Sequence, residues 1–143
     1  MRIAIKRLDP SMELPCFARE GDAGLDLLAS EDVTLAPGER RAVATGIALA
    51  IPEGYAGFVH ARSGRALKEG LAVANAPGLI DSGYRGEIKV IVVNLDPSDP
   101  IEISRGEKVA QLVIQAVVQA ELDEADELPA SQRGVGGFGS TGR

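Results

Sequence analysis

Short runs of β-forming residues, separated by glycine and proline turns, limit the folds open to this chain more than any other feature. Its 143 residues include 17 glycines and 8 prolines. Residues 2–8, 55–61 and 87–95 show the clearest strand patterns. Residues 62–70 are the best candidate for one short helix. This arrangement predicts an all-β fold, a distorted jelly roll or β-sandwich.

Residues 109–118 fit two patterns. Val109, Leu112 and Ala116 would lie on one face of a helix. We predict a strand, because the neighbouring segments are short strands between turns. Gln111 is then a polar residue on an otherwise apolar strand, and the pattern leaves open whether its side chain faces solvent.

Two segments near the C-terminal end differ in composition from the rest of the chain. Residues 119–132 contain five acids and no base, which is typical of a mobile linker. Residues 133–143 contain five glycines, which predicts a flexible tail. We therefore expect the folded domain to span residues 1–118, a length that can bury a hydrophobic core.

The net charge of −6 is unevenly distributed. Outside the acidic linker, 16 acids face 15 bases, so the rest of the chain is nearly neutral. A protein that binds nucleic acids generally needs a basic stripe against the phosphates, and we expect no such partner here. A few well-placed bases can still form a local anion site.

Cysteine and histidine are scarce. Cys16 is the only cysteine, so an intrachain disulfide is excluded and a reducing, cytoplasmic setting is expected. We expect Cys16 itself to be buried or half-buried. His60 is the only histidine, which argues against a Cys/His metal site. No apolar run approaches the ~20 residues that cross a membrane, so no membrane partner is expected.

Residues 75–86 form a turn-rich segment that we predict to be a hairpin between two apolar runs. The segment carries an amide, a carboxylate and a phenol at Asn75, Asp81 and Tyr84. Its three glycines are expected to adopt backbone angles that other residues avoid. We hypothesise that a small planar ligand docks there against exposed main-chain groups. The alternative is an ordinary polar surface turn.

Two further segments are candidates for anion binding. Residues 62–65 follow a strand and read Arg-Ser-Gly-Arg, so two bases would be held on a rigid scaffold. Residues 133–142 expose many backbone N–H groups and resemble a Walker A loop in glycine spacing, but Ser140 stands where the lysine should be. The alternatives are a solvated arginine pair and a tail without function. Asp26 and Asp81 are the oxygen donors that could meet a Mg²⁺ held by phosphates and water.

Taken together, these segments resemble the trimeric dUTP pyrophosphatase (dUTPase) family. Five motifs occur in the family's order and span nearly the whole chain. They are Ala23-Gly24-Leu25-Asp26-Leu27, Arg62-Ser63-Gly64, Asn75 to Gly86, Gly106-Glu107-Lys108-Val109-Ala110-Gln111-Leu112 and Arg133-Gly134 to Gly142. Each motif is weak alone, but five in order are specific.

The resemblance implies a jelly-roll homotrimer with active sites shared between subunits. It implies hydrolysis of dUTP to dUMP and pyrophosphate by attack of water on the α-phosphorus. That reaction keeps uracil out of DNA and supplies dUMP for dTMP synthesis. It further implies Mg²⁺ bound through the substrate phosphates and water, with no direct protein ligand.

The resemblance also assigns roles to residues. Asp81 matches the general base, Asp26 the carboxylate that orients metal-bound water, and Arg133 a base comparable to an arginine finger. Tyr84 would lie against the deoxyribose and Phe138 would stack on uracil. The implied substrate contacts are Arg62, Ser63, Gly64, Asn75, Gly78, Ile80, Asp81, Tyr84, Lys89, Gln111, Arg133, Phe138, Gly139, Ser140 and Thr141.

Two alternative functions remain at this point. A dCTP deaminase shares the fold, but those enzymes lack the glycine-rich closing tail that residues 133–142 supply. A nucleotide-binding or regulatory jelly roll without turnover would need a damaged base or tail, and every motif position is intact in the sequence.

Overall fold

The computed structural model describes residues 1–137, which form eleven strands and one short helix. All strand pairs in this part of the chain are antiparallel. The elements are β1 (Ala4–Arg7), β2 (Leu25–Leu28), β3 (Val33–Leu35), β4 (Arg40–Ala44), β5 (Ile47–Ala50), β6 (Tyr55–His60), α1 (Ser63–Glu69), β7 (Leu71–Val73), β8 (Gly78–Ile80), β9 (Lys89–Asn94), β10 (Ile101–Ile103) and β11 (Lys108–Ala116).

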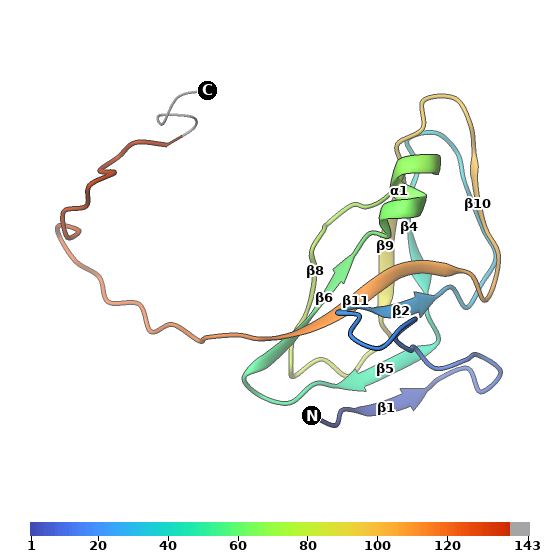
Figure 1. Ribbon diagram of the computed structural model, residues 1–143, viewed down its shortest axis with the longest axis horizontal. Coiled ribbons are helices and arrows are strands. Elements are labelled where there is room, and N and C mark those ends of the chain that lie inside the picture. Colours follow the sequence, from blue (N-terminus) through green and yellow to red (C-terminus); the bar gives the residue numbers. More distant parts are fainter. Residues whose placement is uncertain (138–143) are drawn as a thin grey trace.

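The strands form four small sheets around one core (Figure 1). The largest sheet has the order β2-β11-β6-β8, and a three-stranded sheet has the order β4-β9-β7. β1 pairs with β5, and β3 pairs with β10. The expected all-β class with one short helix is confirmed, and its form is the distorted jelly roll.

Alternating burial along the strands builds the core. In β9, Val90 and Val92 point inward while their neighbours are wholly or partly exposed. Every strand from β2 to β11 contributes at least one buried apolar residue to a single cluster. Within residues 1–137, no aromatic side chain is among the buried members of this cluster, so Val, Ile, Leu and Ala fill it. Burying each of the larger side chains stabilises the fold by about 1.5–3 kcal/mol.

The helix α1 is short because its sequence stops it. Arg62 precedes it in an extended conformation, and Gly70 follows it with φ +73°. This left-handed conformation favours glycine and lets the Gly70 N–H bond back to the Ala66 carbonyl. A Cβ at Gly70 would also lie 2.9 Å from the Asp96 nitrogen, so the turn into β7 depends on glycine.

Residues 109–118 form most of strand β11, as predicted, and not a helix. The predicted hairpin at residues 75–86 is confirmed in part. The apolar runs on either side of the segment contain β7 and β9, which pair antiparallel with each other. The segment is not a simple turn between them, because β8 lies inside it and pairs with β6 in the four-stranded sheet.

Cys16 is exposed, contrary to expectation. It lies in the loop between β1 and β2, where its carbonyl accepts a hydrogen bond from the Asp26 N–H at 3.0 Å. The backbone of Cys16, not its thiol, is what the fold uses.

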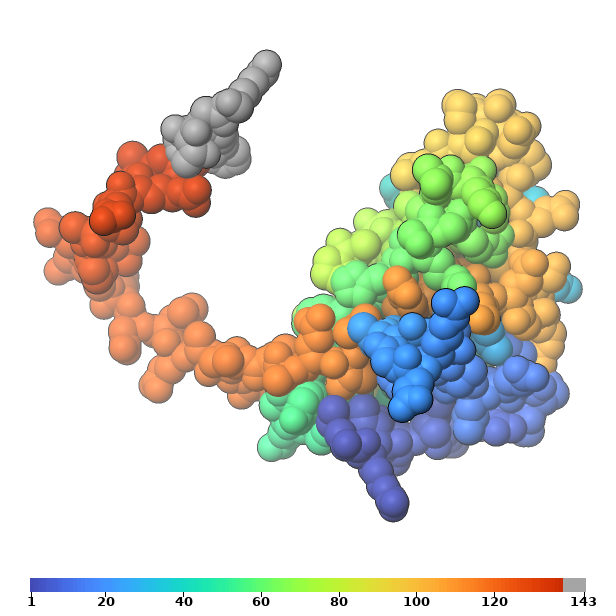
Figure 2. Space-filling view, viewed as in Figure 1, coloured from blue at the N-terminus to red at the C-terminus, as the bar shows by residue number. Residues whose placement is uncertain are grey.

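Residues 117–137 contain no helix or strand and lead away from the domain (Figures 1 and 2). The last strand, β11, ends at Ala116. The division of the chain at residue 118 stays a prediction. Mobility of the acidic linker stays a prediction. Within residues 1–137, no helix has the length and apolar character needed to span a bilayer.

Candidate active site

Two hollows on the domain collect most of the predicted site residues. The first, here called the α1 pocket, has a volume of about 500 Å³ and lies where α1, β2 and β11 meet. The second, the β8 pocket, has a volume of about 680 Å³ and lies beside β8 and the start of β9. Both volumes are in the range of small-ligand sites.

The α1 pocket is organised around a buried carboxylate. Asp26, on β2, has a side chain only 7% exposed. Arg62 pairs with its Oδ1, and Lys108 Nζ lies 2.7 Å from its Oδ2. The Lys108 contact is off the direction of a good hydrogen bond, so it acts mainly through charge. A buried carboxylate is stable here because two cations balance it.

Gln111 lines the same pocket and does not face open solvent. It sits opposite Asp26 in the β2–β11 ladder and opposite His60 in the β6–β11 ladder. Its Nε2 donates to the Ala61 carbonyl at 3.1 Å. A Cβ at Gly24 would lie 3.0 Å from its Oε1, so glycine at that position leaves room for the amide. The amide is therefore held in one orientation at the pocket wall.

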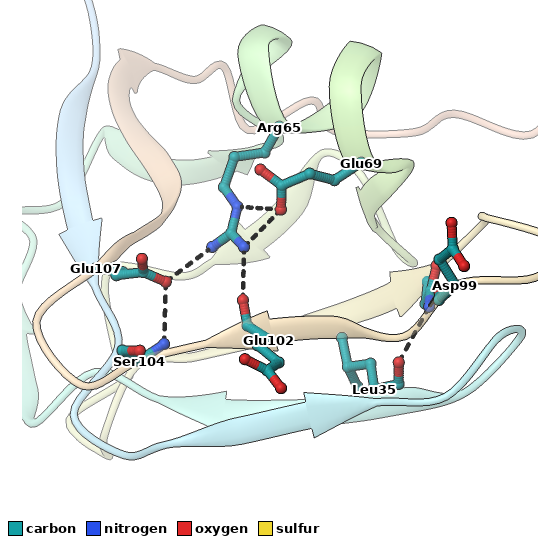
Figure 3. Close-up of polar contacts among 8 residues, drawn as sticks. Leu35, Arg65, Glu69, Asp99, Glu102, Ser104 and Glu107 are labelled. Atoms are coloured by element: carbon teal, nitrogen blue, oxygen red, sulfur yellow. Dashed lines mark hydrogen bonds and ion pairs between the residues drawn. The ribbon is translucent and has the colours of Figure 1, made fainter.

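Arg65 was a candidate anion-binding base, but its guanidinium is already bound to protein. It donates two hydrogen bonds to Glu69 and one to the Glu102 carbonyl at 2.9 Å, and it lies 3.6 Å from Glu107 (Figure 3). Its side chain is 16% exposed. Arg65 thus fastens α1 to the β10–β11 region, and Arg62 is the base at the helix start that borders the pocket.

The β8 pocket combines a free strand edge with polar side chains. β8 is the last strand of its sheet, and only its β6 side carries a strand partner in the described chain. The other edge of such a strand presents main-chain N–H and C=O groups. Asn75, Ile80, Asp81, Tyr84 and Lys89 line the hollow.

The polar groups of this pocket have distinct surroundings. Asp81 is exposed, and no hydrogen bond or ion pair within residues 1–137 engages its carboxylate. The Tyr84 hydroxyl donates to the Glu87 carbonyl at 2.9 Å. Lys89 Nζ lies 3.7 Å from Glu87 Oε2, a partly exposed pair. Among the described residues of this pocket, Asp81 is thus the carboxylate that is free to act on a ligand.

The glycines of residues 75–86 do not serve the backbone role predicted for them. None of Gly78, Gly83 and Gly86 has a positive φ. Gly78 is buried, and a Cβ there would lie 3.3 Å from the Asn75 amide nitrogen. The requirement at Gly78 is therefore space, because a side chain there would crowd Asn75.

The predicted site residues divide into three groups. The α1 pocket contains Asp26, Arg62, Ser63, Gly64 and Gln111, and the β8 pocket contains Asn75, Ile80, Asp81, Tyr84 and Lys89. The two pockets share no lining residue in the described chain. Gly78 lies on β8 and lines neither pocket, and Arg133 is exposed within residues 117–137. Phe138, Gly139, Ser140 and Thr141 lie outside the described residues.

Lys108 lines neither pocket but contacts the buried Asp26, a role that sequence reasoning missed. Simple alternation along a strand would place Lys108 and Gln111 on opposite faces. A register shift between Lys108 and Ala110 breaks the alternation, and both side chains meet the Asp26 region. The place of Lys108 in the motif of residues 106–112 and its charge were the signals in the sequence that could have indicated a role.

No group of three or more potential metal ligands occurs within residues 1–137. Both Asp26 oxygens already face cations, and Asp81 stands alone in the other pocket. This donor set does not suit a metal held directly by protein. It does suit a hard cation carried by phosphate oxygens and water, because Mg²⁺ keeps much of its hydration.

The sequence profile of the dUTPase family matches residues 11–142. The chain belongs to the dUTPase family. Its similarity to individual members is high. The deoxyuridine 5'-triphosphate nucleotidohydrolase of Thermobifida fusca is 59% identical over 142 residues, covering 99% of this chain and 79% of that protein. The enzyme of the same name from Corynebacterium diphtheriae is 55% identical over 140 residues, covering 98% and 92%.

Solved dUTPase structures share the fold. The dUTPase of Staphylococcus bacteriophage 80alpha with dUPNHPP has a TM-score of 0.92 and 30% identity, and the match covers 99% of both chains. A point mutant of the dUTPase from phage phi11 of S. aureus, described with a structural Mg(II) ion, has a TM-score of 0.82 and 29% identity, covering 91% of this chain and all of that one. The dUTPase resemblance is confirmed, and neither the deaminase nor the non-catalytic alternative is favoured.

Proposed function

We infer that this chain hydrolyses dUTP to dUMP and pyrophosphate. The observation that carries the inference is its agreement, over nearly its whole length, with relatives named deoxyuridine 5'-triphosphate nucleotidohydrolase. The reaction would remove dUTP before it enters DNA and supply dUMP for dTMP synthesis. The single cysteine supports a cytoplasmic setting for it.

Asp81 is the general base in this proposal. It is exposed, it lines the β8 pocket, and its carboxylate is free of hydrogen bonds and ion pairs within residues 1–137. An ionised carboxylate in that state can accept a proton from the water that attacks the α-phosphorus. A well-placed base contributes about 10²–10⁴ in rate.

Main-chain groups on the free edge of β8 would recognise uracil by hydrogen bonds. These groups present a fixed pattern of donors and acceptors, and Asn75 adds an amide beside them. Cytosine reverses part of that pattern and would leave buried polar groups without partners. Mismatches of this kind discriminate against the wrong substrate by about 10⁴–10⁵. Tyr84 would lie against the deoxyribose and exclude a 2′-hydroxyl.

The triphosphate would lie along the α1 pocket. Arg62, Ser63 and Gln111 line it and supply a guanidinium, a hydroxyl and an amide as hydrogen-bond donors. Mg²⁺ bound to the phosphate oxygens and to water would supply charge neutralisation for the leaving pyrophosphate. Asp26, buried beside Arg62, would orient that shell of water.

A complete site would require more than one copy of the chain. The groups proposed for uracil and for the phosphates line separate pockets in a single subunit. We propose a homotrimer in which the α1 pocket of one subunit faces the β8 pocket of another. Residues 133–141 would then close over the substrate, with Arg133 near the phosphates and Phe138 on the base. Such closure excludes water from the reaction.

Pyrophosphate release from dUTP, dTTP, dCTP and UTP tests the reaction. We expect release from dUTP alone at substantial rate. The variant Asp81→Asn should bind dUTP but lose about 10²–10⁴ in kcat. Ammonia release from dCTP would replace the proposed function with deamination, and a wild-type kcat in Asp81→Asn would remove Asp81 as the base.

Subunit complementation tests the shared site. Arg62→Ala damages the α1 pocket and Asp81→Asn damages the β8 pocket, so each homotrimer should be nearly inactive. Mixed trimers, formed by refolding the two variants together, should regain activity because some sites receive both intact halves. Mixtures that stay inactive, with exchange verified by mass spectrometry, would place both halves of the site in one subunit.

A further inference from the structure

Gly86 lies directly against the ring of Tyr84. A Cβ at position 86 would lie 2.4 Å from the Tyr84 hydroxyl oxygen, 2.6 Å from Cζ and 3.0 Å from Cε2. Favourable contacts between heavy atoms begin at roughly 3.5 Å. Any residue other than glycine at this position would therefore have to displace the ring by about 1 Å.

The backbone itself does not require glycine at position 86. Gly46 and Gly106 have φ of +70° and +87°, a conformation that other residues rarely adopt, but Gly86 does not share it. Gly83 lies in the same segment, also lacks a positive φ, and has open space around its Cβ position. Space for the Tyr84 ring is thus what distinguishes Gly86.

Tyr84 has little else to hold it. The residue is 47% exposed, and its hydroxyl makes one hydrogen bond within the described chain, to the Glu87 carbonyl. The peptide groups on either side of Gly86 connect Tyr84 to that carbonyl acceptor. The ring is positioned by two features together, the acceptor at Glu87 and the bare backbone at Gly86.

We propose that Gly86 is a positioning residue for sugar selectivity, acting through Tyr84. The proposal rests on the proposed function, in which Tyr84 contacts the deoxyribose. Glycine leaves room for the ring close to the backbone at position 86, where its hydroxyl donates to the Glu87 carbonyl. A methyl group at position 86 would push the ring away from the backbone and from the Glu87 carbonyl. The ring would then no longer exclude the 2′-hydroxyl of UTP at a fixed distance.

The test is the ratio of kcat/KM for dUTP to that for UTP. Gly86→Ala should lower this ratio by at least about tenfold, since small shape differences in a pocket are worth about 10–200-fold. Gly83→Ala is the matched control, because the added methyl meets nothing, and its ratio should equal that of the wild type. A Gly86→Ala ratio equal to that of the control would overturn the proposal.

A double-mutant cycle separates action through Tyr84 from a general structural effect. Gly86→Ala should have no further effect on the ratio in a Tyr84→Ala background, because the displaced ring is absent. An equal effect in both backgrounds would overturn the proposal. If Gly86→Ala alone does not fold, the double variant should fold, since its clash is removed. Failure of both to fold would also count against Gly86 as a positioning residue.

Ring placement can be measured without substrate. The chain has two tyrosines, Tyr55 and Tyr84, so labelled tyrosine gives two NMR ring signals that Tyr84→Phe assigns. In Gly86→Ala, only the Tyr84 signal should shift, and a crystal structure should show its hydroxyl beyond 3.5 Å from the Glu87 carbonyl, the limit of a hydrogen bond. A retained 2.9 Å bond would refute the proposal even if the enzyme acted on another substrate.

Discussion

Replacing Asp26 by asparagine should destabilise the domain as well as slow the reaction. The asparagine keeps the shape of the side chain but removes its charge. Arg62 would lose its ionic partner, and an amide in place of Oδ2 would point a donor at Lys108 Nζ, which lies 2.7 Å from that oxygen. Two cations would then face one neutral group.

Burial sets the size of this effect. Removing one partner of a fully buried ion pair costs about 3–5 kcal/mol, because the remaining charge has no compensation. Here Asp26 is 7% exposed, but Arg62 and Lys108 are 30% and 45% exposed and can turn toward water. We therefore expect a loss of about 2–3 kcal/mol, less than for a fully buried pair. For a chain of this size that corresponds to a fall in Tm of about 6–12 °C.

Thermal and urea unfolding of three variants would measure the charge interaction. Asp26→Asn, Lys108→Met and the double variant form a cycle, with a coupling free energy of about 1–2 kcal/mol expected. Protein concentration must be constant, since association of subunits adds to apparent stability. Lys68→Met is the matched control, a lysine of the same pocket outside the ion pairs of Asp26.

Two results would refute this reasoning. The first is an Asp26→Asn variant as stable as the wild type. The second is a coupling near zero, which would mean that Lys108 rests near Asp26 without stabilising it. In activity, we expect Asp26→Asn to lower kcat by about 10–100-fold, the usual cost of losing a group that orients a metal's water.

Three other predictions follow from other parts of the chain. Arg105 and Ser11 lower the pKa of Asp9 from 3.8 to about 2, so the stabilisation from these contacts is complete above about pH 5 and is lost as the pH falls through 2. The Tm of Asp9→Asn should therefore approach that of the wild type as the pH is lowered through this range. Arg65→Lys keeps one charge but loses the forked hydrogen bonds, which should reduce unfolding free energy by about 1–3 kcal/mol in urea titrations. A chain ending at Gln132 should keep the wild-type Tm but lose most dUTP hydrolysis, and full activity would exclude a closing tail.

The chemistry of the site was largely accessible from the amino-acid sequence. Asp26, Arg62, Asp81 and Tyr84 were selected by residue type, by neighbouring turns and by five ordered motifs, and each lies in one of the two pockets. Such assignments are possible because a carboxylate or guanidinium keeps its chemistry in any fold. The approximate positions of several short strands were also predictable, since alternation and turn residues are local properties.

Long-range pairing was predictable only in part. The pairing of the apolar runs on either side of residues 75–86 was predicted, and these runs do pair, as β7 with β9. The sequence did not indicate that β8, inside the segment, joins β6 or that β4 joins the other edge of β9. The register shift after Lys108 brought that side chain to Asp26. Pairing and register depend on which strands bury the most apolar surface together, and no single segment contains that information.

The three glycines of residues 75–86 also separate what the sequence determines from what the tertiary structure determines. Their presence at positions 78, 83 and 86 follows from the sequence, but the reason for each glycine does not. Gly86 is required by the ring of Tyr84, Gly78 by the side chain of Asn75, and Gly83 meets nothing. Residue types thus specify which reactions are possible. Packing in three dimensions decides which groups meet, because distances between side chains arise only when distant segments share one core.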